Sequence, residues 1–348
     1  MKQHQTKKQS IVIRCIADKQ KGFGNLSRSI ALAEGLREKN YQTLFLIDNE
    51  KQATDILSEK NFSFQIISKK QSSKNQAEYI NKIMSSTNSS LLLLDMREYG
   101  EPLSKFLSKY NFKTILIDDA WCKNVYVDTL VNVTPIQQYH KYKKINEKSR
   151  IYVGAKYFIA DKKFLRHKKI FSQHKMMKII ISMGGSDPDD LTSFVTKSLL
   201  TLPEIQVRVV LGPLYLHRNK LKNMIKSNHN FTIVDKPKNI WEEFSRSDLA
   251  ISNAGNTLFE LAIMGIPTVC MAAVKHQIPY AEIFAKKCFA KNVGYGKKIT
   301  QKAILNTTLS ILSDIRLRKK MSKAGPMIVD GKGLSRVIDV IEKTIFTE

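Results

Sequence analysis

Short apolar runs alternate with longer amphipathic stretches along almost the whole chain, and this alternation constrains the fold most. Ten runs carry it, at 11–16, 43–48, 62–67, 91–95, 114–119, 178–183, 206–212, 231–235, 249–253 and 267–272. Runs of this length are typical of strands buried on both faces of a parallel sheet. The stretches between them carry apolar residues at helical spacing, for example at 27–39, 189–201, 215–227, 256–264 and 277–287. Repeated strand–helix units predict parallel sheets with right-handed crossovers.

The alternation stops in a basic stretch and then restarts, which predicts two domains in the 348 residues. We expect an N-terminal Rossmann-like domain at 1–155, a basic linker at 156–175, a second Rossmann-like domain at 176–330 and a C-terminal helix at 331–348. The predicted fold class is α/β, with two doubly wound domains that face each other across a cleft. Ligands of such sheets bind beyond the carboxyl ends of the strands, so functional residues should directly follow the apolar runs.

Basic residues outnumber acidic ones by 57 to 31, which gives a formal charge of +26. The excess is spread through the chain, since residues 1–170 carry +15 (31 basic, 16 acidic) and residues 171–348 carry +11 (26 basic, 15 acidic). With 45 Lys and 12 Arg, the chain lacks the Arg forks typical of base-reading proteins, and no nucleic-acid partner is predicted. The dense basic run at 141–169 is either a solvated linker face or a surface for an anionic membrane or a polyanionic substrate.

The sequence also bears on the compartment. The first apolar run is short and interrupted by Arg14, so it is not a secretory signal. The stretch 258–274 contains Glu260, Gly265 and Pro267, and we interpret it as a buried helix, turn and strand rather than a membrane span. The four Cys show no CxxC spacing and are expected to be buried reduced thiols, and no His pair has metal-ligand spacing. We expect a cytoplasmic protein, with peripheral contact to the inner face of a membrane left open.

Glycine-containing loops follow the first strand of each predicted domain. In 22–28 (GFGNLSR), two glycines would let the backbone approach a ligand, and the start of the next helix favours an anion. An ordinary helix-capping turn would have the same sequence. In 184–188 (GGSDP), Asp187 and Pro188 have the form of a helix start, with Asp as the cap and Pro in the first turn.

Two further loops follow strands of the second domain. Segment 252–260 (SNAGNTLFE) predicts a diphosphate cradle built from backbone N–H groups and the side chains of Asn256 and Thr257. Glu260 lies one turn into an otherwise apolar helix, where a carboxylate needs a partner. That partner could be a pair of ribose hydroxyls, or a nearby Lys or helix cap. Farther on, His276 and Gln277 could meet a sugar or a phosphate, although His276 could equally be a surface residue.

In their order and spacing, these segments resemble the PseG-type UDP-sugar hydrolases and the related spore-coat polysaccharide proteins, within the GT-B (MurG-like) superfamily. The resemblance covers nearly the whole chain. It is most specific at 184–188 (GGSDP) and at 253–260 (NAGNTLFE) followed by 265–267 (GIP). Smaller matches lie at 13–14 with 22–24, at 117–119 (IDD), at 153–157 (VGAKY), and at 330–333 (DGKG) with Arg336. The resemblance implies GT-B architecture.

By this resemblance, the second domain would bind UDP, and the first would face the sugar. The nucleotide would be held by Gly185, Ser186, Gly255, Asn256, Thr257 and Glu260. The sugar side would be lined by Gly22, Gly24, Arg28, His276 and Gln277. No cofactor beyond the UDP moiety of the substrate is expected, and no metal, because helix ends and Lys could meet the diphosphate charge. The oligomeric state is not predicted.

The resemblance has one important departure, at the position where the family has a His that is proposed to act as the base. This chain has Asn25 there, and a carboxamide cannot take a proton from water or from an acceptor hydroxyl. The family's Asp two residues after Arg14 is also replaced, by Ile16. The residues that could substitute are Asp18, Asp95, Asp118, Asp119 and His276. We take Asn25, Asp18 and Asp119 as the candidate catalytic residues, with Asn25 orienting a water or a sugar hydroxyl.

Four functions are compatible with these features. The leading hypothesis is hydrolysis of a UDP-linked amino or acetamido sugar at its anomeric carbon, in surface-polysaccharide or nonulosonic-acid (pseudaminic acid) biosynthesis. The alternative is a glycosyltransferase that moves the sugar to a lipid-linked or glycan acceptor, which the changed first loop and the positive charge favour. A third possibility is a non-catalytic nucleotide-sugar binder. A nucleic-acid binder would explain the charge but none of the glycine loops.

Overall fold

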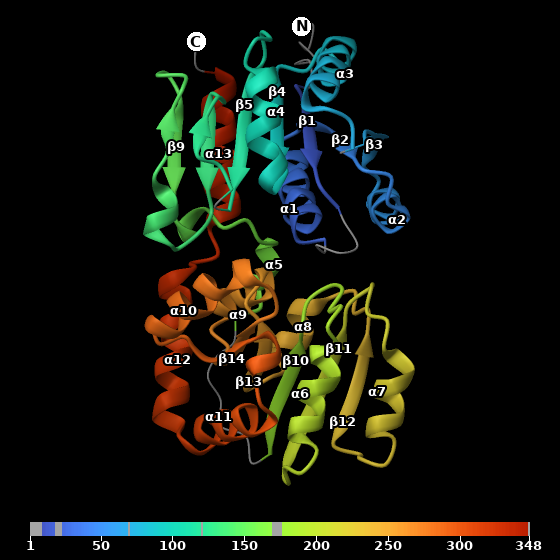
Figure 1. The fold of residues 1–348 in the computed structure, drawn as a ribbon, viewed down its shortest axis with the longest axis vertical. Coiled ribbons are helices and arrows are strands. Elements are labelled where there is room, and N and C mark those ends of the chain that lie inside the picture. The colour runs from blue at the N-terminus through green and yellow to red at the C-terminus, as the bar shows by residue number, and fades with distance from the viewer. Residues whose placement is uncertain (1–8, 18–22, 69, 120, 169–175, 347–348) are drawn as a thin grey trace, which may run out of the picture. The chain divides into compact units, whose positions relative to one another are not determined.

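The computed structural model describes residues 9–17, 23–68, 70–119, 121–168 and 176–346, and it divides the chain into two compact units. Within these residues, unit 1 comprises 9–17, 23–161 and 332–346, and unit 2 comprises 162–168 and 176–331. Both units are built around a parallel sheet with helices packed on it (Figure 1). The α/β fold class with two doubly wound domains is therefore confirmed.

Unit 1 has a seven-stranded sheet in which every neighbouring pair is parallel. Its strands, in spatial order, are β3 (Ser63–Ile66), β2 (Gln42–Ile47), β1 (Ser10–Cys15), β4 (Leu91–Asp95), β5 (Lys113–Asp118), β7 (Thr129–Asn132) and β9 (Arg150–Val153). A separate two-stranded ladder joins β6 (Asn124–Val125) to β8 (Lys143–Lys144). The chain moves from β1 to β2 on one side and later to β4 on the other, so the direction of winding reverses between β1 and β4.

Helices of unit 1 connect these strands, and one comes from the other end of the chain. They are α1 (Gly24–Glu38), α2 (Lys51–Glu59), α3 (Ser73–Ser86), α4 (Gly100–Leu107) and α13 (Gly333–Phe346), with 3-10 turns η1 (Arg97–Tyr99), η2 (Gln137–His140) and η3 (Ala155–Tyr157). The C-terminal helix α13, red in Figure 1, packs against α1 and β5. Gly35 of α1 allows this approach, because a Cβ there would lie 2.6 Å from Ile338 Cδ1. The Thr129 and Thr344 hydroxyls hydrogen-bond at 2.9 Å.

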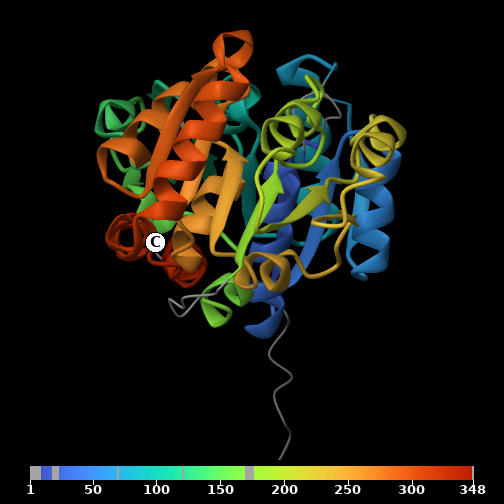
Figure 2. The ribbon, with the colours of Figure 1, turned by 90° about the horizontal axis from the view of Figure 1, so that it is seen from below.

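Unit 2 has a six-stranded parallel sheet. Its strands, in spatial order, are β12 (Phe231–Asp235), β11 (Ile205–Leu211), β10 (Met177–Ser182), β13 (Leu249–Asn253), β14 (Thr268–Ala272) and β15 (Ala290–Tyr295). Its helices are α5 (Lys162–Arg166), α6 (Leu191–Leu199), α7 (Arg218–Ile225), α8 (Ile240–Ser245), α9 (Asn256–Met264), α10 (Ile278–Lys286), α11 (Gln301–Ser313) and α12 (Ile315–Ile328), with 3-10 turns η4 (Lys275–Gln277) and η5 (Gly296–Lys298). They cover both faces of the sheet, with α6 against α11 and α9 against α12 (Figure 2).

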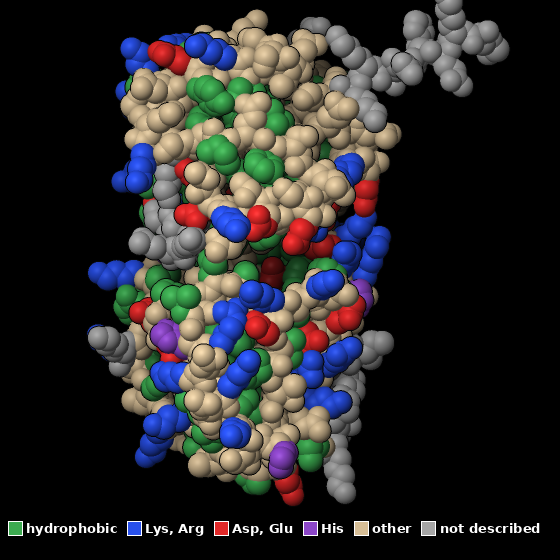
Figure 3. Space-filling model, turned by 90° about the vertical axis from the view of Figure 1, so that its right-hand side faces the viewer, with side chains coloured by type: hydrophobic (Ala, Val, Ile, Leu, Met, Phe, Trp, Pro, Cys, Tyr) green, Lys and Arg blue, Asp and Glu red, His purple; other side chains and the backbone are tan. Residues whose placement is uncertain are grey.

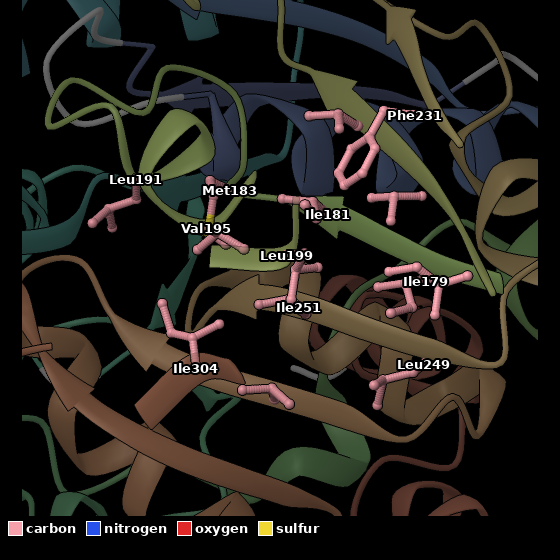
Figure 4. Packing of buried hydrophobic residues seen from close by; sticks show 14 of the residues in the cluster. Ile179, Ile181, Met183, Leu191, Val195, Leu199, Phe231, Leu249, Ile251 and Ile304 are labelled. Carbon is pink, nitrogen blue, oxygen red and sulfur yellow. The ribbon is translucent and has the colours of Figure 1, made fainter. Parts of the chain in front are cut away.

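The core of unit 2 forms where the apolar strands meet helix α6. Ile179 and Ile181 of β10 and Ile251 of β13 are fully buried and face Val195 and Leu199 of α6 in one cluster (Figure 4). β-branched side chains suit such a strand because they pack well on a pleated surface. This packing fixes the edge of the sheet at which β10 and β13 end, where the candidate site lies.

The predicted elements agree with the observed ones in most of the chain. All ten apolar runs are strands, and 256–264 is a helix with the predicted bounds. The stretch 258–274 is the predicted buried helix, turn and strand, and no helix in the described part of the chain is long and apolar enough to cross a membrane. The sequence patterns did not predict β7, β9 and β15. Helix α6 begins at Leu191, three residues later than a helix with Pro188 in its first turn would.

The positive charge shows no single patch on the face drawn in Figure 3. Over unit 2, Lys and Arg side chains are spread across many places on that face, with acidic side chains between them. Several of the basic groups are paired, such as Arg208 with Glu243 and Lys220 with Asp190. The carboxylates of these pairs are already counted in the net charge of +26.

Candidate functional site

In unit 2, the predicted nucleotide residues lie at the point where the strand order reverses. β10 and β13 are neighbours, and the chain winds to β11 on one side and to β14 on the other. Loops after such a pair leave an open crevice, which is where parallel α/β sheets bind ligands. The two loops meet directly, because the Asn253 side-chain amide donates to the Met183 carbonyl at 3.0 Å. The structure therefore brings the 184–186 and 253–257 segments together.

The loop after β10 is rigidly held and has open space beside it. Gly184 has φ +84°, a left-handed conformation that favours glycine. Gly212, at the end of β11, packs so closely that a Cβ would lie 2.4 Å from the Gly184 and Gly185 carbonyl oxygens. The Leu214 N–H also donates to the Gly185 carbonyl at 3.0 Å. A Cβ built on Gly185 would meet nothing within 4 Å, so this backbone borders space that a ligand could fill.

Asp187 accepts hydrogen bonds from the start of α6, as predicted for a capping residue, although the N-cap position itself is occupied by Asp190. Its carboxylate accepts the Leu191 N–H at 3.0 Å and the Thr192 N–H at 2.7 Å. Burial raises the pKa of Asp187, and its hydrogen bonds to Thr192 and Leu191 lower it again in part. Asp190 is the N-cap itself and also accepts from the Tyr215 hydroxyl at 2.5 Å.

The helix after β13 begins at a glycine. Gly255 is the N-cap of α9 in extended conformation, and it has no side chain that could cap the helix. The first N–H groups of a helix lack partners within it and favour an anion. Gln277 is buried beside this turn, with its side-chain oxygen accepting the Ala273 N–H at 2.9 Å. Its amide nitrogen would lie 3.2 Å from a Cβ on Gly255.

One face of α9 carries the polar residues predicted for the nucleotide. Asn256, Thr257 and Glu260 are half-buried, while Leu258, Phe259 and 261–264 are buried. Residues three and four apart share a face of a helix, so Glu260 lies beside Asn256 and Thr257, on the side facing the first turn. Ser186 is also half-buried, whereas His276 is exposed. The structure thus assembles the predicted nucleotide residues with Gln277.

In unit 1, a buried polar cluster lies where the winding reverses between β1 and β4. Asp95, at the end of β4, is its centre and is 1% exposed. Its carboxylate accepts from the Asn25 amide at 2.5 Å, from Arg28 Nε at 2.7 Å and from the Ser29 hydroxyl at 3.1 Å. Arg28 Nη2 also contacts Asp95, which makes the pair bidentate. These donors fix the position of the Asp95 carboxylate in the cluster.

Arg28 joins Asp95 to the second predicted carboxylate. Its Nη1 donates to Asp119 Oδ2 at 3.2 Å, and the Asp119 side chain is 20% exposed. Burial alone would lower the pKa of Arg28, but the Asp95 and Asp119 carboxylates raise it above its ordinary value. Arg28 therefore stays charged and is neutralised by these two groups.

The remaining sequence-predicted candidates near the first strand and the end of β5 are placed as follows. Asp18 and Gly22 lie outside the described residues, and Gly24 is the first residue of α1. Asp118 is buried, accepts the Tyr142 hydroxyl at 2.7 Å and the Trp121 and Cys122 N–H groups, and serves the local fold. Burial raises its pKa, followed by the neighbouring Asp119, while its hydrogen bonds lower it. Asn25 and Asp119 are linked by hydrogen bonds, because Asn25 and Arg28 both donate to Asp95 and Arg28 also donates to Asp119.

Sequence reasoning missed Arg97 in this cluster. Arg97 Nε donates to Asn25 Oδ1 at 3.1 Å, across 72 residues of sequence. The signal that could have found it is its position two residues after the strand 91–95, because functional residues are expected just beyond the carboxyl ends of parallel strands. Among the described residues, no group of three or more His, Cys, Asp or Glu side chains could hold a metal ion.

With this geometry in view, comparison with known proteins shows what unit 2 is similar to. Residues 179–335 match the model of the glycosyltransferase family 28 C-terminal domain. The match begins in β10 and contains both loops of the unit 2 site. The predicted resemblance to the GT-B superfamily is confirmed by it.

Relatives and solved structures extend the likeness to nearly the whole chain. The spore coat polysaccharide biosynthesis protein SpsG of Bacillus subtilis is 26% identical over 329 residues, which are 93% of this chain and 95% of that protein. The structure of MurG from Acinetobacter baumannii is 14% identical and matches with a TM-score of 0.72, over 97% of this chain and 100% of that chain. A putative UDP-N-acetylglucosamine 2-epimerase from Listeria monocytogenes is 12% identical, with a TM-score of 0.66 over 97% and 96% of the two chains.

These likenesses establish the GT-B fold class, and they show that unit 2 is similar to the glycosyltransferase family 28 C-terminal domain. They leave the reaction open, because a glycosyltransferase-type domain and an epimerase are both among the matches. A fold of this kind supports several reactions, so the reaction must be argued from the site.

Proposed function

We propose that this protein is a glycosyltransferase of surface-polysaccharide biosynthesis that binds a UDP-linked sugar in unit 2 and transfers the sugar to a hydroxyl-bearing lipid-linked or glycan acceptor. The observation that carries the proposal is the meeting of the Gly184–Ser186 and Gly255–Glu260 segments at the reversal of strand order, within the region that matches a glycosyltransferase domain. The likeness to a spore-coat polysaccharide biosynthesis protein supports the biosynthetic context.

In this proposal, the diphosphate lies at the start of α9. The first N–H groups of α9 and the Thr257 hydroxyl would donate to its oxygens, and Gly185 would leave space for its approach. Glu260 would accept from the two ribose hydroxyls, since one carboxylate can accept from both. The Gln277 amide beside Gly255 would meet the sugar side of the diphosphate. The leaving diphosphate would thus be stabilised by preorganised donors, which is the main need of this reaction.

The match of residues 179–335 to a glycosyltransferase domain supports transfer to an acceptor over attack by water. Asn25 does not separate the two reactions, because its side chain donates to Asp95, accepts from Arg97 and cannot take a proton from water or from an acceptor hydroxyl. Hydrolysis of the same UDP-sugar is the second candidate. Asp119 favours it, because this carboxylate is partly exposed beside the cluster and could activate water.

UDP binding tests the nucleotide site. Titration calorimetry should show that wild type prefers UDP to ADP, and that Glu260→Gln lowers UDP affinity about tenfold, which corresponds to about 1.4 kcal/mol. Glu282→Gln is the matched control, because Glu282 is exposed on the neighbouring helix α10. UDP affinity that is unaffected by Glu260→Gln would rule out this ribose assignment.

Product analysis separates the reactions. A panel of UDP-sugars is offered without acceptor, and then with polyprenyl-linked or glycan acceptors, while UDP and free sugar are both measured. Release of UDP that requires an acceptor supports transfer. Stoichiometric free sugar without an acceptor establishes hydrolysis, and UDP-sugar binding without either product indicates a non-catalytic binder. We expect the reaction to continue in EDTA, because the proposal assigns the diphosphate charge to helix N–H groups.

A further inference from the structure

Arg97 occupies an unusual position beside the cluster of unit 1. It lies two residues beyond the end of β4, at the edge of the sheet from which the connections after β1 and β4 lead to opposite sides. Its backbone has φ +50°, in the left-handed region that a long side chain rarely adopts. Strained residues of this kind persist where the surroundings hold them, and they gather at ligand sites. Because the exposed Glu204 and Lys236 share this backbone region, it is the side-chain contacts of Arg97 that set this residue apart.

Asn25 fixes the direction of the Arg97 side chain. The Asn25 amide nitrogen donates to Asp95, and its oxygen accepts from Arg97 Nε at 3.1 Å. Asn25 is 4% exposed and Asp95 is 1% exposed, so the contact is built on a buried base. Because Nε donates to Asn25, this contact orients the planar guanidinium, and the N–H groups of its two terminal nitrogens remain as further donors.

The charge of Arg97 is not neutralised within its cluster. Arg28 is paired with both Asp95 and Asp119, which uses the two carboxylates that contact it. Among the described residues, Arg97 makes no ion pair, and its two terminal nitrogens have no hydrogen-bond partner. A guanidinium stays charged at any physiological pH and offers two parallel N–H bonds to a carboxylate or a phosphate.

We propose that Arg97 is the anion-binding residue of unit 1, which recognises a carboxylate or phosphate on the sugar or on the acceptor, and that Asn25 positions it. This inference rests on the proposed function, because it assumes that unit 1 receives the sugar or acceptor side of the reaction. The anion is a group other than the UDP diphosphate, which belongs to unit 2. Its two sources are a carboxylate on the transferred sugar and a phosphate on the acceptor.

Binding measurements on the full chain distinguish these sources. The probes are UDP, UDP-N-acetylglucosamine, UDP-glucuronate and a short-chain polyprenyl phosphate in detergent. If the sugar carries the anion, wild type prefers UDP-glucuronate to UDP-N-acetylglucosamine. If the acceptor carries it, wild type binds the polyprenyl phosphate. In either case, Arg97→Asn should lower affinity for that probe at least tenfold and leave UDP affinity unchanged, and Asn is chosen because it tolerates a left-handed backbone.

The controls separate recognition from folding and from general charge. Lys105→Gln removes an exposed positive charge in α4 and should change none of the affinities more than twofold. Arg97→Asn should melt no lower than wild type. Asn25→Ala should lower the same affinity as Arg97→Asn, and the double variant should be no weaker than Arg97→Asn alone, because the two residues act as one unit. A purely structural role for Asn25 would make the losses additive.

Several results would overturn the proposal. One is a wild type that neither prefers UDP-glucuronate nor binds the polyprenyl phosphate. Others are an equal loss in Lys105→Gln, and a loss of UDP affinity in Arg97→Asn, which would assign Arg97 to the nucleotide. Failure of wild type to bind UDP would count against the proposed function, whereas a polyprenyl phosphate affinity that depends on Arg97 would still support the anion site.

Discussion

At the scale of single residues, Asp95 is the group on which the polar cluster of unit 1 depends. Replacing Asp95 with Asn removes the negative charge that pairs with Arg28. It also leaves one acceptor oxygen where the carboxylate has two. Breaking the buried bidentate pair leaves Arg28 with only the partly exposed Asp119 as a partner, so we expect Asp95→Asn to lower the free energy of unfolding by about 3 kcal/mol. Chemical denaturation measures this loss. Asp55→Asn, at an exposed site in α2, should cost less than about 0.5 kcal/mol.

The cysteines give a second residue-scale prediction and a correction. Cys15, Cys122 and Cys270 are buried as predicted, but Cys288 is exposed, because it lies in the turn after α10 with φ +60°. Burial raises the pKa of Cys15 and of Cys270 to about 12, and it raises that of Cys122 as well. Iodoacetamide at pH 8 should therefore label Cys288 alone in the native protein. Intact mass and peptide mapping read this out, and labelling of Cys15 before unfolding would contradict it.

The unit 2 site could be predicted from sequence further than the unit 1 site. Segment 253–260 is continuous, and strand, turn and helix lie close together along the chain, so the pattern itself places Asn256 and Glu260 on one face. In unit 1, Asn25 meets Asp95 across 70 residues and Arg97 across 72. No local pattern specifies such contacts. Residues of this kind are found only when the fold brings their strands together.

At the scale of elements, the contact between the ends of β10 and β11 shapes the 184–186 loop, which is proposed to bind the nucleotide. Gly212→Ala would place a Cβ 2.4 Å from two backbone oxygens of Gly184 and Gly185, so the loop would have to move. We expect UDP affinity to fall at least tenfold although residue 212 does not touch the nucleotide. The Cβ added by Gly185→Ala would have no atom within 4 Å, so this variant should keep the wild-type melting temperature. It should still bind UDP more weakly, because the Cβ would occupy the space proposed for the nucleotide.

Calorimetry with UDP and thermal melting of the same two variants check this pair. If Gly185→Ala bound UDP as tightly as wild type does, the open space beside Gly185 would not be part of the site. If Gly212→Ala did so, the loop would tolerate displacement and the role assigned to its geometry would be wrong.

Three strands of the two large sheets, β7, β9 and β15, were not predicted by the pattern of apolar runs. Most of the ten predicted strands are buried between helices and are therefore apolar, whereas β3 and β12 are edge strands whose apolar residues still revealed them. β9 and β15 are edge strands with several partly exposed positions, so RIYV and AKNVGY carry no continuous apolar run. β7 is buried but only four residues long, and its TLVN pattern is too short to separate from a helix or a loop. The predictions failed at the side of each sheet where strands are short or half-covered.

At the scale of the whole molecule, the formal charge of +26 is distributed and not concentrated. Several cations are paired with carboxylates, and the basic side chains on the face in Figure 3 lie among acidic ones. At physiological salt, exposed charges more than about 8 Å apart are largely screened. The charge therefore adds a general attraction to anionic surfaces, while the specific anion contacts proposed here belong to the loops at the two reversals of strand order.

The course of the chain leads to the last prediction. Unit 2 is continuous from 162 to 331, whereas unit 1 needs α13 from the C-terminal end, which packs on α1 and β5. A fragment of residues 162–331 should fold cooperatively and bind UDP with an affinity close to that of the full chain. A fragment of residues 1–161 would expose the apolar face that Ile338 covers at Gly35. Uncovered apolar surface of this extent destabilises a domain, so this fragment should unfold at lower temperature or aggregate.

Adding a peptide of residues 332–348 to the 1–161 fragment supplies the missing helix and should raise its melting temperature in proportion to the logarithm of peptide concentration, as mass action requires. Circular dichroism melts with and without the peptide measure this effect. A peptide with Ile338→Asp should fail to stabilise the fragment, because it would bury a carboxylate against Gly35. If residues 1–161 melted as a stable domain without the peptide, α13 would be an accessory to unit 1 and not one of its structural elements.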